Sequence, residues 1–203
     1  RRVRRRPGAA MIAARTLSER LAVARLAALP DAMTAILRPL FPDVTVRTHP
    51  GRIDVADVVA GDIFQPPMIA VSVIGATAPV QVPGQYDIVA ECAAYVVTEE
   101  MAISGRSTPR EQVALALCHG LLDILADFQT PRWGLGDITR PAEMRAQPLF
   151  TALSYQKGFC FYAVTWRQTL FAEGAPMTPP MPTERLETIE DGETITLWPE
   201  VGS

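Results

Sequence analysis

Three side chains on one predicted helix have the types and the spacing of a metal or acid/base site. His119, Asp123 and Asp127 recur at every fourth residue, which stacks them on one face of a helix. An imidazole and two carboxylates can bind a divalent metal ion or exchange protons with a substrate, so a metal-dependent hydrolase is one hypothesis. Gln112 and Ala116 continue the same face, opposite the leucines. This pattern favours a second interpretation, in which the three residues belong to the solvated side of an amphipathic helix.

The remaining reactive residue types form no catalytic motif. The chain has two histidines, and its three cysteines, Cys92, Cys118 and Cys160, lie far apart without a C-x-x-C pair. Cys92 and Cys160 fall within apolar runs that predict strands, which is typical of buried thiols. No nucleophile elbow, P-loop or dinucleotide-binding glycine motif occurs. We therefore expect a protein without enzymatic activity and without a bound cofactor or metal.

Basic charge is concentrated at the first residues of the chain. Five of the first six residues are arginines, namely Arg1, Arg2, Arg4, Arg5 and Arg6. Removing these five charges from the net charge of −3 leaves −8, and an acidic remainder argues against a general nucleic-acid binder. The arginine cluster itself is either a DNA contact, through phosphate oxygens, or a flexible terminus. No apolar run reaches the roughly 18 residues that a membrane span requires, so no membrane contact is expected.

Apolar spacing predicts the helices that would position these residues. One stripe predicts a helix from about residue 17 to a break at Pro30, and Asp31 begins a second helix that nearby prolines close. The strongest helix pattern begins at Thr108 as N-cap, with Pro109 at the first helical position. Its predicted apolar stripe consists of Val113, Leu117, Leu121, Ile124 and Phe128.

Runs rich in β-branched residues predict the strands. They cover residues 44–48, 68–74, 86–98 and 159–171, with a short strand near 136–140, and the density of the run at 159–171 predicts a central strand. The link 75–85 holds two prolines and two glycines, as a mobile hairpin loop would. After Glu173 the composition becomes proline-rich, and the Asp191-Gly192 pair predicts a hairpin beyond it.

These elements predict an α+β fold with a mostly antiparallel sheet flanked by helices. We expect three parts: a basic N-terminal segment at 1–11, one domain at 12–173, and a proline-rich linker with an acidic C-terminal extension at 174–203.

Read in order, residues 12–173 resemble the tail terminator family of Mu-like bacteriophages, a small α/β fold. The resemblance rests on the order and spacing of six segments: Ala27-Ala28-Leu29-Pro30, Thr48-His49-Pro50-Gly51, the strand 69–74, the helix 109–128, Ile138-Thr139-Arg140-Pro141, and Ala163-Val164-Thr165-Trp166-Arg167-Gln168. The arginine cluster and the C-terminal extension lie outside this pattern.

The resemblance implies a structural subunit of the virion tail or neck that is assembled in the host cytoplasm. Six copies would form a homohexameric ring on the last ring of tail tube protein, stop tube polymerisation and present a docking surface to the head-tail connector. Phage DNA would pass through the lumen, which we expect to be net acidic. Candidate interface residues lie in segment 55–67, link 75–85 and the C-terminal hairpin: Ile63, Phe64, Gly75, Pro79, Val80, Val82, Pro83, Ile195, Leu197 and Trp198.

Two further hypotheses remain open beside the terminator and the hydrolase. A head-closure or adaptor protein of the neck would also be a small, ring-forming α/β chain. A host cytoplasmic interaction module would recruit partners through the stretch Pro179 to Pro182 and the acidic tail.

Overall fold

The computed structural model describes residues 15–52, 65–78, 86–127, 132–149, 156 and 158–173, and the backbone of residues 187–190 and 193–196. The helical elements in these ranges are α1 (Leu17–Val23), α2 (Arg25–Leu37), the 3-10 turn η1 (Arg38–Leu40) and α4 (Arg110–Ala126). The strands are β1 (Thr45–Thr48), β2 (Met68–Thr77), β3 (Tyr86–Thr98), β4 (Met101–Ile103), β5 (Arg106–Thr108), β6 (Ala142–Pro148), β7 (Cys160–Glu173), β8 (Glu187–Glu190) and β9 (Glu193–Thr196).

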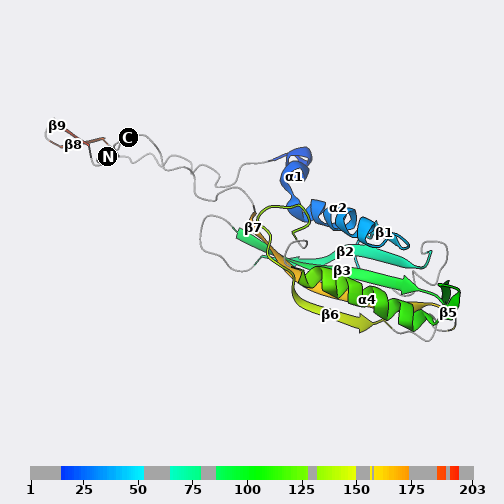
Figure 1. Cartoon of the computed structure of the whole chain (residues 1–203). Coiled ribbons are helices and arrows are strands. Elements are labelled where there is room, and N and C mark those ends of the chain that lie inside the picture. The colour runs from blue at the N-terminus through cyan, green and yellow to red at the C-terminus, as the bar shows by residue number, and fades with distance from the viewer. Residues whose placement is uncertain are drawn as a thin grey trace.

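A five-stranded sheet in the order β1-β2-β3-β7-β6 forms the body of the molecule (Figure 1). The β1–β2 pair is parallel and every other pair in this sheet is antiparallel, which confirms the predicted α+β fold with a mostly antiparallel sheet. The long strands β3 and β7 pair along almost their whole length. The prediction of an internal strand at 159–171 is also confirmed, because β7 lies between β3 and β6.

The two faces of the sheet carry separate apolar clusters. On one face, buried side chains of β2, β3 and β7 pack against α2 and α4 in a core that includes Leu29, Met33, Cys118 and Leu121. The other face contributes a second buried cluster, which contains no residue of a described helix. Its members come from β2, β3 and β7 and are Met68, Ala70, Ala93, Tyr95, Val97, Phe161 and Ala163. The second face is called the helix-free face below.

The first helical region bends at Ala24 and not at Pro30, so the predicted boundary is wrong. Thr16 caps α1 through a capping box with Glu19, and Ala24 leaves the helical conformation with φ −80° and ψ 86°. Pro30 lies inside α2, where it costs about 3 kcal/mol. The helix continues because it buries Leu29, Met33 and Leu37, and each of these large side chains contributes roughly 1.5–3 kcal/mol. The predicted pair of helices before the sheet is nevertheless present.

The strong helix is confirmed as α4, with a different start and a rotated buried face. Pro109 occupies the N-cap position and makes no side-chain cap, so the predicted Thr108 cap is wrong. Of the predicted stripe, Val113 and Leu121 are buried, whereas Leu117 and Ile124 are half-buried and Phe128 lies outside the described residues. The remaining buried positions are Ala114, Cys118 and Leu125. Small side chains at two of these positions let α4 approach the sheet closely.

Two strand regions differ from the sequence prediction. The short strand predicted at 136–140 is reduced to a single bridge between Ile138 and Leu170, and the polar stretch after it forms the edge strand β6. The hairpin β4–β5 was not predicted. Its turn residues Ser104 and Gly105 both have positive φ, at 52° and 77°, as a two-residue hairpin turn of this type requires. The predicted C-terminal hairpin is confirmed in its backbone as the antiparallel pair β8–β9.

Candidate functional site

The predicted metal or acid/base row on α4 lies on the solvent side of that helix. His119 Nε2 lies 3.3 Å from Asp123 Oδ2, and these side chains are 79% and 69% exposed. Asp127 is the C-cap residue, and it is exposed as well. Among the described residues, no group of three or more histidine, cysteine, aspartate or glutamate side chains is placed to hold a metal ion. The row has the geometry of an exposed i, i+4 ion pair followed by a helix end.

Cys92 is buried in its strand as the apolar pattern predicted, Cys160 is half-buried in its strand, and Cys118, which lay outside the predicted stripe of its helix, is buried as well. Burial raises the pKa of Cys92 to about 12 and that of Cys118 to about 11, because a thiolate loses its hydration there. Burial also raises the pKa of Cys160. A thiolate nucleophile needs a lowered pKa, so none of these positions has the environment of a catalytic cysteine.

These pKa shifts predict slow thiol labelling of the folded chain. At pH 8 a pKa of about 12 leaves roughly one Cys92 in ten thousand as thiolate. We expect an aromatic disulfide reagent to label Cys92 and Cys118 far more slowly in the folded chain than in denaturant, where all three cysteines react. Mass spectrometry of the labelled peptides separates the three sites. Rapid labelling of Cys92 in the folded chain would contradict this placement.

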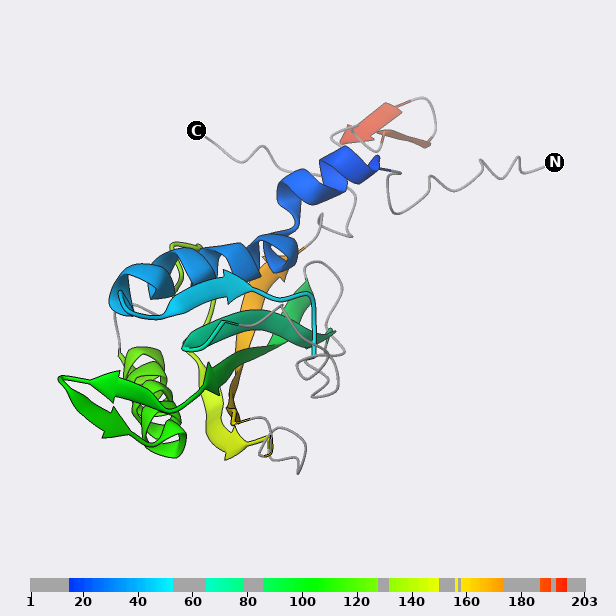
Figure 2. The same ribbon diagram turned by 90° about the vertical axis from the view of Figure 1, so that its right-hand side faces the viewer.

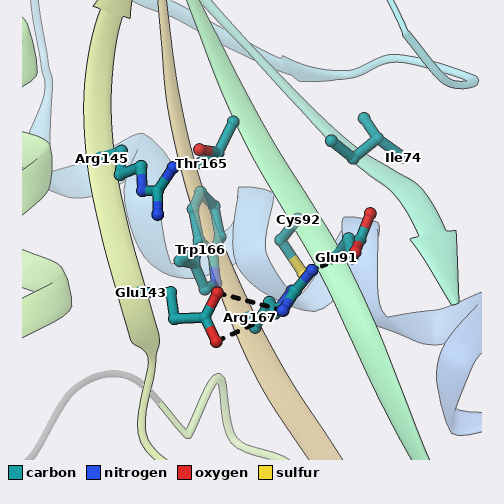
Figure 3. A pocket seen from close by; sticks show the side chains of 8 residues that line it. All are labelled: Ile74, Glu91, Cys92, Glu143, Arg145, Thr165, Trp166 and Arg167. Atoms are coloured by element: carbon teal, nitrogen blue, oxygen red, sulfur yellow. Dashed lines mark hydrogen bonds and ion pairs between the residues drawn. The ribbon is translucent and has the colours of Figure 1, made fainter. Parts of the chain in front are cut away.

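A charged pocket lies on the helix-free face, near the edge of the sheet (Figure 3). One cross-strand row places Gly75 beside Glu91, and Glu91 beside Arg167. Arg167 Nη2 donates to Glu91 Oε1 at 2.9 Å, and Nη1 lies 3.1 Å from Glu143 Oε2. These contacts join β3, β7 and β6, and the bond to Glu91 is the main cause that raises the pKa of Arg167. The pocket encloses about 240 Å³ and is also lined by Arg145.

Arg167 pairs with both carboxylates of this pocket, Glu91 and Glu143, whereas Arg145 makes no ion pair with either of them. Arg167 is 48% exposed and Glu143 is 56% exposed, so water screens the pairs and each contributes little to stability. Gly75 leaves room beside them for Glu91, because a Cβ atom at this position would lie 3.1 Å from Glu91 Oε2 and the carboxylate would have to shift slightly. The prediction that a loop begins at Gly75 is wrong, because β2 continues through a bulge to Thr77. We interpret the pocket as a brace between strands.

The outer edge of the sheet is guarded against pairing with another strand. All seven residues of β6 are exposed, and no other described strand pairs with its outer side. A register shift between Ala142 and Arg145 interrupts the strand, and Glu143 has a positive φ of 54°. The Leu149 N–H donates to the carbonyl oxygen of Phe161 on β7. Because successive residues of a strand point their N–H groups to opposite sides, the backbone at Pro148 faces the open side of β6. Proline has no N–H, so this position offers no donor to an added strand. Bulges and prolines of this kind prevent edge-to-edge association.

Exposed apolar side chains gather instead on α1. This helix buries none of its residues, and Leu17, Leu21 and Val23 are 73%, 60% and 56% exposed. Figure 2 shows α1 leading away from the body beyond the first turn of α2. Arg25, the first residue of α2, is anchored by donating to the carbonyl oxygens of Gly136 and Phe171. The start of α2 is therefore held on the sheet, while α1 stands free of it.

A second apolar surface lies beyond the other end of α2. It is a cavity of about 530 Å³ between the segment after η1, the β4–β5 hairpin and α4. We call it the hairpin groove, and its main apolar lining residues are Leu40, Phe41, Val44, Met101, Ile103 and Leu117. Leu40 and Ile103 are 47% and 45% exposed, which is unusual for large apolar side chains that share one concave surface. Asp43 provides an acidic group in the lining.

Most of the interface and DNA-contact residues predicted from the sequence fall outside the described residues. These are Ile63, Phe64, Pro79, Val80, Val82, Pro83, Leu197 and Trp198, and the arginines Arg1, Arg2, Arg4, Arg5 and Arg6. Ile195 lies in β9, of which only the backbone is described. The sequence prediction missed both α1 and the hairpin groove as surfaces. The signal for α1 was present, because Leu17 and Leu21 precede the bend, but only the position of that bend exposes them.

The fold and these surfaces define an α+β protein in which the described helices α2 and α4 pack on one face of a mostly antiparallel sheet, with two exposed apolar surfaces. No protein-family model matches the chain, and no curated protein matches its sequence. None of the helices among the described residues has the length and apolar composition that a membrane crossing needs.

Proposed function

We propose that this chain is a structural ring subunit that acts as the tail terminator of a Mu-like phage. In this role it closes on the end of the tail tube, stops polymerisation of the tube protein and offers its other face to the head-tail connector. The observation that carries the proposal is the pair of exposed apolar surfaces, α1 and the hairpin groove, at opposite ends of α2. A subunit joined to one neighbour at each end needs two such surfaces.

The geometry of the titratable groups also supports a structural role. The α4 row is an exposed contact between His119 and Asp123, the buried thiols have raised pKa values, and both carboxylates of the charged pocket are paired with Arg167. The guarded edge of β6 further limits how copies can associate, because uncontrolled strand pairing would produce open aggregates. At the β6 edge, copies would then be joined by side-chain surfaces and not by backbone pairing.

The acidic character of the chain agrees with a ring around moving DNA. Without its first six residues the chain is acidic, and an acidic lumen would not retain the duplex through phosphate pairing. The proposal places the N-terminal arginines away from the lumen, or in contact with DNA only when the DNA is held in the neck. A continuous arginine lining in a reconstruction of the ring would contradict it.

Tail length in particles made without the protein tests this function. We expect the mutant lysate to contain tails longer than normal that lack heads, because nothing ends tube polymerisation. Supplying the intact chain from a plasmid should restore both length and head attachment. Tails of normal length that fail to attach heads would instead assign the chain to head closure or to a neck adaptor. Normal particles would remove the virion role altogether.

A further inference from the structure

We infer that α1 of one copy docks in the hairpin groove of the next copy, so that the subunits join head to tail. This inference rests on the proposed ring function and names the surfaces that would build the ring. Three of the large apolar side chains that are most exposed belong to α1, and two others line the groove. A single copy therefore carries a projecting apolar element and an apolar cavity that it leaves unfilled.

The occupant must come from a second copy, because α1 cannot reach the groove of its own chain. The groove begins where η1 ends, so the 13 residues of α2 separate it from α1. A helix rises about 1.5 Å per residue, which makes this separation roughly 20 Å, whereas α1 is only about 10 Å long. The single residue Ala24 joins the two helices, and Arg25 holds the start of α2 on the sheet. Figures 1 and 2 both place α1 and the β4–β5 hairpin beyond opposite ends of α2.

The two surfaces also match in polarity and charge. At 100° per residue, Leu17, Leu21 and Val23 fall within an arc of about 160° on α1, and Arg20 lies in the same arc. The groove presents apolar side chains with Asp43 among them. Within the described part of the chain, neither Arg20 nor Asp43 makes an ion pair or a side-chain hydrogen bond. An Arg20–Asp43 pair would complete both surfaces on docking and fix the direction of α1 in the groove.

A contact between unlike surfaces has a consequence for symmetry. When a patch on one copy binds a different patch on the next, the contact repeats around an axis and closes a ring if the rotation permits. The same patch meeting itself would instead stop at a dimer. The head-to-tail contact thus predicts that a copy with a defective α1 still accepts a neighbour in its groove, and that a copy with a defective groove still donates α1.

Two single variants of the full-length chain and their mixture test the inference, with assembly followed by sedimentation velocity and native mass spectrometry. L21D alters α1 and I103D alters the groove, and each alone is expected to weaken self-association by about a hundredfold or more, because an acid replaces a buried anchor. An equimolar mixture of the two should form a one-to-one heterodimer and nothing larger, since only one complementary pair of surfaces remains. Leu115, which is 52% exposed on α4 and does not line the groove, provides the control L115D, expected to assemble like the parent.

The remaining outcomes separate failure of this inference from failure of the proposed function. If L21D assembles like the parent while I103D does not, another segment fills the groove and the inference is wrong, although the ring stands. If both variants form the parent ring, other surfaces build it and the inference is again wrong. If the parent chain stays monomeric at high concentration and on tail tubes, the ring function itself fails. Rescue of the charge reversal R20E by D43R would confirm the orientation of α1.

Discussion

Replacing Gln168 with leucine is expected to lower the free energy of unfolding by about 3–5 kcal/mol, since each buried polar group left without a partner costs roughly 1–3 kcal/mol. The Gln168 side chain is buried at the centre of β7, where its Oε1 accepts from Trp133 Nε1 at 2.7 Å and from Trp166 Nε1 at 3.0 Å. Its Nε2 donates to the carbonyl oxygen of Thr139 at 2.9 Å. Leucine would leave two indole N–H groups and this carbonyl without partners.

Urea denaturation of the full chain, followed by far-UV circular dichroism, measures this effect, because that signal does not depend on the tryptophans that are replaced below. Gln147 on β6 provides a matched control, because it is exposed, and the same replacement there should change the stability by less than about 0.5 kcal/mol. Combining Q168L with phenylalanine at both tryptophan positions removes the orphaned donors and should recover part of the loss. A Q168L chain as stable as the parent would show that the two indole groups find other partners.

Replacing Leu121 with alanine is expected to cost about 2–5 kcal/mol, the usual range for a fully buried leucine, because it removes apolar contact and leaves a cavity. Leu121 is 1% exposed on the face of α4 that packs against the sheet. Its matched control lies on the same helix: Leu115 is 52% exposed, so alanine there should change the stability by less than about 0.5 kcal/mol.

The same denaturation experiment checks the position of the buried face of α4. The predicted stripe and the observed face share Leu121 but differ at Cys118, which is 2% exposed. The observed face predicts that a bulky C118L replacement overpacks the core and destabilises the chain by roughly 1–3 kcal/mol. A neutral effect of C118L, together with a large effect of L115A, would show that α4 is rotated from the position described above.

Local sequence patterns were reliable where the backbone preference is strong over a long run. The runs at 86–98 and 159–171 correspond to β3 and β7 to within about two residues at each end, because long runs of β-branched and aromatic side chains fit the pleated, buried surface of a sheet. The residues used to predict where helices begin and end were less reliable. Pro30 suggested a helix end, yet burial of Leu29 and Met33 on either side of it outweighs the lost hydrogen bond.

The features that bear on function were mostly not visible in the sequence. The stretch 142–148 alternates apolar and polar residues, but Met144 is its only large apolar side chain, so the strand signal is weak and β6 was recognised only from its pairing with β7. The hairpin groove joins Leu40 of η1 to residues of β4 and α4 that lie more than sixty positions further along the chain, and no local pattern relates them. The α4 row did show its amphipathic spacing, and the solvated interpretation of His119 and Asp123 agrees with their exposure.

The sequence by itself determined the types of most elements, the α+β class and the burial of Cys92 in its strand, because these depend on the preferences and polarity of nearby residues. Tertiary structure alone decided which strands are neighbours, where α1 separates from α2 and which side chains satisfy Gln168. Its Trp133 partner lies 35 residues away. Such contacts depend on how distant segments pack, and the free energy of packing is a property of the whole chain that no window of sequence contains.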